Sequence, residues 1–326
     1  MKWILRLLGT VVFLGIILRS VDLHKILIIL QQVPVWGYVL LFITYLFNQL
    51  LNTYRWKILL DVAGVKESIK SLYVALLYGQ TINQILPSSI GGDSTRVAYL
   101  WKRYDHQRVE SLSSTLLDRM LGLTALILIA SINLPFVREF NPQQKIMGVS
   151  IFGLILLLFY GSFMGKLDFI IKGILGFQKI PDFFRSPMAR VWHVFQEFRN
   201  EKRGVFKAFF ISLLTQSIMI FSQYFMFLLI GVDISLLKLF LVIPVVTLIV
   251  ALPISIGGIG VREAALVRFL DINNDTVLSF TLIRYSYYIF LPLFLFIMSW
   301  FVDGWGDFDR EKDDGSSLEA KNQANG

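Results

Sequence analysis

The segment LPSSIGGDSTRVAYL at residues 86–100 recurs at an offset of 166 residues (86 to 252) as LPISIGGIGVREAAL at residues 252–266. Nine of the fifteen aligned positions are identical, and they include the proline, the glycine pair and the arginine. The same offset aligns a downstream trio, Ser113, Thr115 and Leu116, with Ser279, Thr281 and Leu282. A leucine-rich chain matches leucines by chance, but it does not match Pro, Gly-Gly and Arg in one register. We therefore interpret the two segments as copies of an internal repeat.

Both copies lie at the end of an apolar run and contain residues that break helices. Proline removes a backbone donor and glycine permits unusual backbone angles, so each copy interrupts a helix. Interrupted hydrophobic segments at corresponding places in two halves are typical of binding sites near the membrane midplane. We expect two re-entrant hairpins, at residues 71–100 and 238–268. The alternative is a pair of kinked helices that simply cross.

The rest of the chain has the composition of an integral membrane protein. Of its 326 residues, 55% are hydrophobic and 17% are charged, and the mean hydropathy is +0.64. A run of about 18 uncharged apolar residues is long enough to cross the hydrocarbon core as a helix. Runs of this kind cover residues 26–54, 71–92, 120–137, 146–165, 208–232, 239–261 and 285–302. We predict an all-α polytopic fold with no soluble domain and no barrel, since period-2 alternation is absent.

The charges set a predicted topology in the bilayer. We expect six full crossings, at residues 3–19, 34–54, 112–134, 146–165, 206–230 and 276–302, besides the two hairpins. With both termini cytoplasmic in the plasma membrane, most of the 31 Lys and Arg residues fall on the inner side, as the positive-inside rule requires. Residues 3–19 resemble a signal peptide without a cleavage site. The alternative to a crossing there is a helix that lies at the interface.

This topology predicts one transmembrane domain at residues 1–302. Repeat one covers residues 34–134 and repeat two covers 206–302. Their hairpins enter from opposite faces, which makes an inverted-topology pair. The connector at residues 166–205 is basic and has an amphipathic helical pattern, so we expect it to lie on anionic lipids of the inner leaflet. Residues 303–326 are acidic and rich in Gly, Ser and Asn, and we expect a disordered tail.

Two arginines are the leading candidates for substrate binding. Arg96 and Arg262 each follow a glycine pair, in the first turn of an expected half-helix. A cation there opposes the helix dipole unless an anion binds between the backbone amides and the guanidinium. The alternative is that both arginines snorkel to the interface. The predicted site also contains Asp93 as a helix cap, together with Asn83, Gly91, Gly92, Gly257, Gly258 and Glu263.

A further set of charges falls within predicted membrane segments. Asp118, Arg119 and Arg284 lie there, and charges in a membrane are costly and are functional candidates by default. Asp118 and Arg284 are equivalent under the 166-residue offset, so we expect them to form an intramembrane ion pair. The alternative interpretation is that these charges only neutralise one another.

Several kinds of chemistry find no support in the sequence. The chain has no cysteine, and its three histidines are scattered, so we expect no metal site and no cofactor. The segment Gly257-Gly258-Ile259-Gly260 lacks the βαβ context of a dinucleotide loop. No catalytic constellation is apparent. The net charge of +8 fits lipid head groups better than nucleic acid in a chain this apolar.

Around the two Gly-Gly segments the sequence resembles the lysylphosphatidylglycerol synthase transmembrane region family of flippase-like proteins. The matching residues are Asn83–Leu86, Pro87, Gly91-Gly92-Asp93, Arg96, Asp118-Arg119, Gly122, Pro253, Gly257-Gly258, Gly260 and Arg262-Glu263. The resemblance covers about residues 1–302. It implies re-entrant helical architecture and translocation of a lipid with an anionic or modified head group. The aminoacyltransferase domain of some members is not in this sequence, so lysyl transfer is not expected.

These observations favour a flippase or transporter for a lipid with a phosphate-containing head group, either a phospholipid or a polyprenyl-phosphate-linked glycan. The alternatives are a membrane-embedded transferase and an accessory subunit in lipid glycosylation or modification. The expected partners are membrane lipids and an enzyme of lipid modification.

Overall fold

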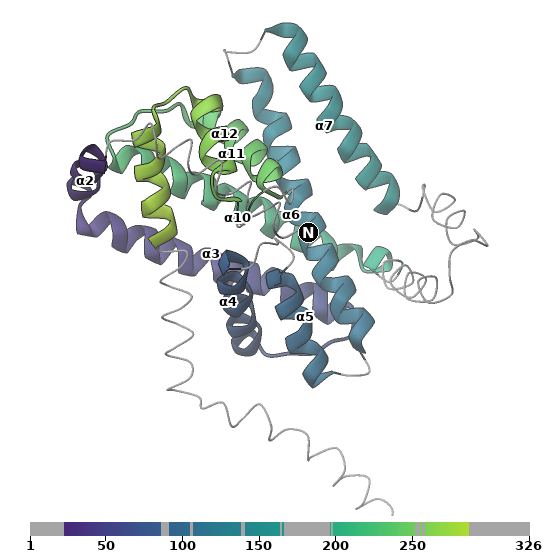
Figure 1. Cartoon of the computed structure of the whole chain (residues 1–326). Coiled ribbons are helices and arrows are strands. Elements are labelled where there is room, and N and C mark those ends of the chain that lie inside the picture. The colour runs from purple at the N-terminus through teal and green to yellow at the C-terminus, as the bar shows by residue number, and fades with distance from the viewer. Residues whose placement is uncertain are drawn as a thin grey trace, which may run out of the picture.

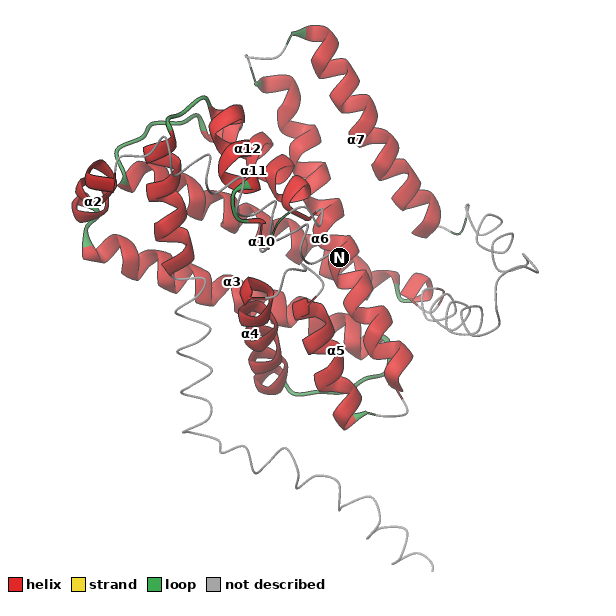
Figure 2. Cartoon of the chain, viewed as in Figure 1, coloured by secondary structure: helices red, strands yellow, loops and turns green. Residues whose placement is uncertain are grey.

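The computed structural model describes residues 23–85, 91–104, 107–137, 141–163, 165, 196, 198–251, 255 and 258–286. Within these ranges the secondary structure is helical and contains no strand (Figure 2). The helices are α2 (Leu23–Gln32), α3 (Val35–Val62), α4 (Ile69–Ile85), α5 (Gly91–Arg103), α6 (Arg108–Asn133), η2 (Leu134–Phe136), α7 (Pro142–Phe163), α10 (Lys202–Leu229), α11 (Leu236–Ala251) and α12 (Val261–Leu270). Residues 274–286 are also helical. The all-α prediction is confirmed.

Among the described residues, three helices are long and apolar enough to cross a membrane: α3, α6 continued by η2, and α10. The apolar window of α6 is 61% buried, whereas those of α3 and α10 are 22% and 28% buried. Phe47 on α3 and Phe210 and Phe221 on α10 expose about half of their surface, at 51%, 52% and 50%. Apolar surface of this kind is what hydrocarbon contacts. Helix α6 is therefore the central element, and α3 and α10 present lipid-facing sides.

Helices α3 and α10 run antiparallel along one seam, the α3–α10 seam. A Cβ added at Gly37, near the start of α3, would lie 2.8 Å from Leu229 Cδ1 at the end of α10. A Cβ at Gly204, at the start of α10, would lie 2.7 Å from Val62 Cγ2 at the end of α3. Small residues at a helix interface let two backbones approach closely, which is how transmembrane helices gain van der Waals contact.

Two helix pairs occupy the places where the sequence predicts hairpins. Helix α4 packs against α5, and α11 packs against α12 (Figure 1). Both α5 and α11 also contact α6, so the two pairs share one central helix. The second pair is anchored by a buried apolar cluster in which Phe227 of α10 stacks on Phe280, with ring centroids 4.3 Å apart. The turns at residues 86–90, 252–254 and 256–257 lie outside the described residues.

The connection between α3 and α4 is fixed to the end of α5. Tyr104 donates a hydrogen bond from its hydroxyl to the carbonyl oxygen of Lys66, at 2.7 Å, and Arg103 forms an ion pair with Glu67 at 3.5 Å. Burial, and then the charge of Glu67, raise the pKa of Tyr104 above its ordinary value. The hydroxyl therefore remains a donor throughout the neutral range.

Some predictions fall on residues that the structure does not describe. These are the crossing at 3–19, most of the connector at 166–205, the last part of the crossing at 276–302, and the tail at 303–326. The predicted crossing at 34–54 lies in α3, but α3 continues to Val62. A helix that continues past residue 54 is compatible with a crossing at 34–54, and the extent of the crossing stays a prediction. In the structure Arg55 is 7% exposed and lies inside the helix.

Candidate functional site: a buried arginine–aspartate network

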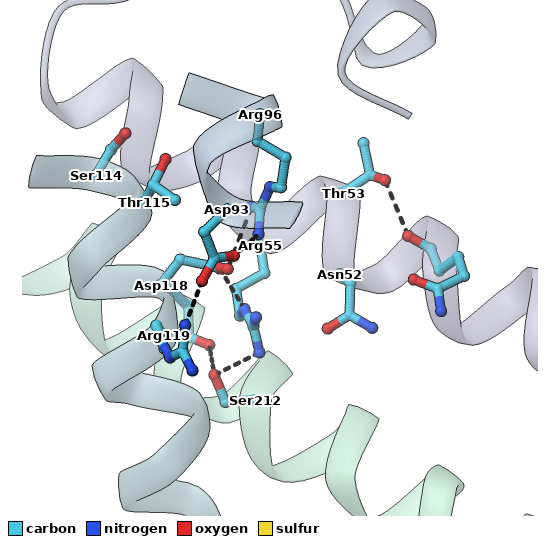
Figure 3. A network of polar contacts seen from close by, with 12 residues as sticks. Asn52, Thr53, Arg55, Asp93, Arg96, Ser114, Thr115, Asp118, Arg119 and Ser212 are labelled. Atoms are coloured by element: carbon cyan, nitrogen blue, oxygen red, sulfur yellow. Dashed lines mark hydrogen bonds and ion pairs between the residues drawn. The ribbon is translucent and has the colours of Figure 1, made fainter. Parts of the chain in front are cut away.

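Five charged side chains from three helices meet in the interior (Figure 3). Arg55 comes from α3, Asp93 and Arg96 come from α5, and Asp118 and Arg119 come from α6. We call this set the arginine–aspartate network. The three helices come from separate parts of the sequence, and the network forms because α6 packs against both α3 and α5.

Asp118 is the centre of the network and is 3% exposed. Its Oδ1 accepts a hydrogen bond from Arg55 Nε at 2.6 Å, and its Oδ2 accepts one from Arg96 Nη2 at 3.3 Å. An unpaired carboxylate at such a site would lose several kcal/mol of solvation, on the order of the effective penalty for a buried ion. The two guanidinium groups offset this cost, and Asp118 in turn fixes the positions of both arginines.

Asp93 forms the outer edge of the network. Its Oδ2 accepts a hydrogen bond from Arg119 Nη1 at 2.7 Å, and Arg96 Nη1 lies 3.5 Å from its Oδ1. The side chains of Asp93 and Arg119 are 24% and 31% exposed, against 4% for Asp118. Arg96 therefore bridges a buried carboxylate and a partly open one. The network leads from the interior of the protein to its surface.

Helix α10 is the fourth helix that contacts the network, and it supports Arg55. Ser212 Oγ accepts a hydrogen bond from Arg55 Nη1 at 3.2 Å and donates one to the carbonyl oxygen of Ala208 at 3.0 Å. Ser212 is fully buried, so this contact lies within the α3–α10 seam. Arg55 is thus held by hydrogen bonds at two of its nitrogens, by α6 on one side and α10 on the other.

Arg96 also stacks on Trp56, and this corner has donors without acceptors. The guanidinium carbon lies 4.0 Å from the centroid of the Trp56 ring, which is cation–π geometry. Among the described residues, the Nε of Arg96 and the Nε1 of Trp56 are both buried and have no hydrogen-bond partner. A buried donor left unpaired costs about 1–3 kcal/mol. We call this pair of side chains the Arg96–Trp56 corner.

The charge balance of the network also favours binding of an anion. The network contains three arginines, Arg55, Arg96 and Arg119, and two aspartates, Asp93 and Asp118, so its five side chains carry one excess positive charge. An anionic oxygen that reached the Arg96–Trp56 corner could accept a hydrogen bond from Arg96 Nε or from Trp56 Nε1, and its charge would offset the excess positive charge. Phosphate oxygens form strong charge-assisted bonds of this kind. Within the described residues no group of three or more His, Asp or Glu side chains could hold a metal ion.

The second repeat copy is organised differently. Glu263 is 1% exposed, and its Oε2 accepts a hydrogen bond from the backbone N–H of Gly260 at 2.6 Å. Its Oε1 accepts a hydrogen bond from Thr281 at 3.0 Å. Arg262 donates from Nη1 to the hydroxyl of Tyr285 at 3.0 Å. Glu263 thus caps the start of α12 and ties it to the helix at 274–286.

The structure brings together four predicted residues: Asp93, Arg96, Asp118 and Arg119. The predicted ion pair between Asp118 and Arg284 is wrong. The oxygens of Asp118 accept hydrogen bonds from Arg55 and Arg96 instead, because these side chains of α3 and α5 lie next to it. The expectation that Asp93 caps α5 is also wrong. Asp93 lies in the first turn of a helix that already begins at Gly91, and its carboxylate turns toward Arg119.

The remaining predicted positions are placed as follows. Gly91 and Gly92 open α5, and Asn83 lies near the end of α4 with its side chain outside the described set. Gly257 is not among the described residues. Gly258 has φ +77°, and a Cβ there would come within 2.3 Å of Val250 Cγ1, so this position requires glycine.

Sequence reasoning missed Arg55, Trp56 and Ser212. One signal was available for the first of these. A carboxylate inside an apolar run needs a cation, and Arg55 directly follows an uncharged run that ends at Tyr54. Nothing in the sequence marks Ser212 or Trp56, because their roles depend on which helices become neighbours.

Comparison with known proteins identifies the family of this chain. Residues 3–302 match the family described as the lysylphosphatidylglycerol synthase TM region. The chain belongs to this family. The lysylphosphatidylglycerol synthase TM region family is a family of membrane proteins whose name refers to lipid synthesis. Membership confirms the resemblance and makes this chain a helical integral membrane protein with a lipid-related function.

Two archaeal relatives are similar to the family member described here. A UPF0104 membrane protein of Methanothermobacter thermautotrophicus is 28% identical over 239 residues, covering 67% of this chain and 70% of that protein. A UPF0104 membrane protein of Methanocaldococcus jannaschii is 28% identical over 117 residues, covering 36% of this chain and 34% of that protein. Both names describe membrane proteins and neither states an activity.

Proposed function

We propose that this protein translocates a lipid with a phosphate-containing head group across the bilayer, either a phospholipid or a polyprenyl-phosphate-linked glycan. The phosphate binds at the Arg96–Trp56 corner of the arginine–aspartate network. The observation that carries the proposal is the pair of buried, unpaired donors beside one excess positive charge. A phosphate satisfies all of these groups together, whereas a neutral head group would leave the charge uncompensated.

The second hairpin supports a transport cycle. Adding the 166-residue offset to Asp118 gives 284, next to Tyr285. Arg96 contacts Asp118 on the helix that follows its hairpin, and Arg262 contacts Tyr285 on the helix that follows the other hairpin. Each hairpin arginine therefore reaches the next helix at a corresponding place. An inverted-topology repeat of this kind moves a solute by alternating access, with the site exposed first to one leaflet and then to the other.

The two hairpins differ in their charged residues, so they are not equivalent as binding sites for a head group. The first contains Asp93 and is linked to Asp118, whereas the second has Ile259 at the position of Asp93 and uses Glu263 as a cap. We infer that the head group binds on the side of the first hairpin. In this cycle the second hairpin moves relative to the first, and its movement exposes the head-group site to one leaflet or the other.

The sharpest test is Trp56→Phe. Phenylalanine keeps an aromatic ring under the Arg96 guanidinium but removes the Nε1 donor, for which no described residue is a partner. The smaller ring leaves a cavity at this fully buried position, but removal of the unpaired donor offsets that cost, so the net change in stability should be small. It should slow transport by roughly 10- to 100-fold, because one hydrogen bond to a charged group contributes about 1.5–3 kcal/mol. Transport is measured in liposomes containing a phospholipid labelled on its chain, by chemical bleaching of the label in the outer leaflet.

Trp36→Phe on the same helix is the matched control, because Trp36 is 60% exposed. Unchanged transport in Trp36→Phe and loss in Trp56→Phe is the expected result. Equal transport by Trp56→Phe and the wild type would remove the head-group site. Absence of transport by the wild type with either class of phosphate lipid would remove the function itself. A new lipid product detected by mass spectrometry would instead favour the transferase.

A further inference from the structure

The α3–α10 seam contains a groove of about 300 Å³ at the end remote from the arginine–aspartate network. It is lined by Leu40, Leu41 and Thr44 of α3 and by Ile218, Phe221, Ser222 and Phe225 of α10. We call it the seam groove. Leu40 and Phe221 at its rim are 44% and 50% exposed, so it is open to the outside of the protein. In a membrane protein, exposed apolar surface of this kind faces lipid.

The lining of the seam groove suits hydrocarbon. Five of the seven lining side chains are aliphatic or aromatic. The hydroxyl of Thr44 already donates to the carbonyl oxygen of Leu40 at 2.8 Å, so it does not require a ligand. The groove has about twice the volume of the roughly 150 Å³ apolar cavity that binds benzene. It therefore has room for a segment of an alkyl or prenyl chain, and its mostly apolar lining does not suit a polar head group.

The position of the seam groove relative to the network matches the dimensions of one lipid. Thr44 and Arg55 are eleven residues apart on α3, which is about 16 Å of helix and close to three complete turns, so both lie on one face. Ser222 and Ser212 on α10 are ten residues apart, or about 15 Å. Half of the hydrocarbon core is also about 15 Å thick. A lipid tail that starts at the network therefore reaches the groove within one leaflet.

We propose that the seam groove binds one hydrocarbon chain of the same lipid whose phosphate occupies the Arg96–Trp56 corner. This inference rests on the proposed function. Arg55 and Ser212 lie in the seam between the groove and the network, since they are buried and in contact across α3 and α10. The lipid thus lies along the α3–α10 seam with its head inside the protein and its tail in the groove, partly in contact with the bilayer.

Photolabelling of the unmodified full-length chain tests this inference. The probe is a phospholipid with a diazirine near the end of one chain, reconstituted in phosphatidylglycerol vesicles. The matched probe is the diacylglycerol with the same chains and no phosphate. We expect the phospholipid to label the seven groove residues about tenfold more than the diacylglycerol does. A head-group anchor of about 1.4 kcal/mol has that effect.

Two variants, Ser222→Phe and Trp56→Phe, test whether one lipid occupies both the seam groove and the Arg96–Trp56 corner. Ser222→Phe fills the groove and should lower labelling there by about tenfold, because burial of two or more methylene groups is lost. Leu214→Phe is the matched control on α10, since Leu214 is 49% exposed and does not line the groove. Trp56→Phe should also lower labelling of the groove by the phospholipid, while leaving labelling by the diacylglycerol unchanged.

The outcomes separate the two proposals. Equal labelling by both probes, unaffected by Trp56→Phe, would show a general lipid contact and overturn the inference, even if transport is normal. Cross-links between two copies of the chain at the groove would show that a second protein molecule covers it, and would also overturn the inference. If Ser222→Phe does not fold, the comparison of the two probes on the unmodified chain still decides. Loss of transport by the wild type bears on the proposed function alone.

Discussion

At the scale of single residues, Asp118 determines how the interior is arranged. It is the most buried member of the arginine–aspartate network and accepts hydrogen bonds from two arginines that come from different helices. The sequence marked Asp118 as a membrane charge and Arg96 as a candidate for substrate binding. It assigned the wrong partner, because the 166-residue offset relates equivalent positions in two copies and does not say which of them touch.

Asp118→Asn should be strongly destabilising. The asparagine carries no charge, so Arg55 and Arg96 would remain buried with Asp93 as the nearest carboxylate, and only for Arg96. Removing one partner of a buried ion pair costs about 3–5 kcal/mol. Asp61→Asn is the matched control on α3, because the Asp61 side chain is 46% exposed in its pair with Lys57. It should change stability by less than about 0.5 kcal/mol.

The measurement is thermal unfolding in detergent, followed by tryptophan fluorescence. If Asp118→Asn and Asp61→Asn unfold at the same temperature, the network contributes nothing to stability and its ion pairs are incidental. A double-mutant cycle that combines Asp118→Asn with Arg55→Gln measures the direct coupling between Asp118 and Arg55.

At the scale of elements, the α3–α10 seam holds the functional region in place. Glycines near its two ends, Gly37 and Gly204, bring the helices close, and the Arg55–Ser212 contact lies between them. The sequence predicted both helices from their hydropathy. It could not predict that they are neighbours, because apolar runs specify burial in lipid but do not specify which helix each one contacts.

Gly204→Leu should separate the start of α10 from the end of α3. Even a Cβ would lie 2.7 Å from Val62 Cγ2, and the longer side chain cannot be accommodated without moving one helix. Overpacking of this kind typically costs about 1–3 kcal/mol. Gly153→Leu in α7 is the control, because no atom lies within 4 Å of a Cβ built there.

The readout is again the unfolding temperature, together with phospholipid transport. We expect Gly204→Leu to lower both and Gly153→Leu to change neither. A Gly204→Leu protein with wild-type stability would mean that the seam is not closely packed at that end.

At the scale of the whole molecule, two helix pairs, α4 with α5 and α11 with α12, both contact the central helix α6. The inverted arrangement of the two repeat copies in the membrane is a proposal. It predicts that the loop before the first pair and the loop before the second pair lie on opposite faces. The loops contain Lys66 and Asp233, both exposed.

Single-cysteine labelling tests this arrangement directly, because the chain has no cysteine of its own. Lys66→Cys in sealed cells should react with a membrane-impermeant maleimide only after permeabilisation. Asp233→Cys should react without it. Reaction of both residues from the same side would contradict the inverted repeat, while leaving the fold and the arginine–aspartate network unaffected.

The sequence by itself determined the class of the protein and the identity of several important charges. Unbroken apolar runs can be satisfied only as membrane helices, and a charge within such a run needs a counter-charge wherever the run is placed. The pattern of Pro and Gly-Gly likewise indicated where helices are interrupted.

Only the tertiary structure decided which groups meet. Arg55 completes the network from α3, Ser212 supports it from α10, and Trp56 leaves a donor open beside Arg96. The physical reason is that hydropathy and local propensity act along one helix, whereas ion pairing and close packing act between helices. Neighbours far apart in sequence are chosen by the fit of whole helix faces, including the glycines that allow close approach.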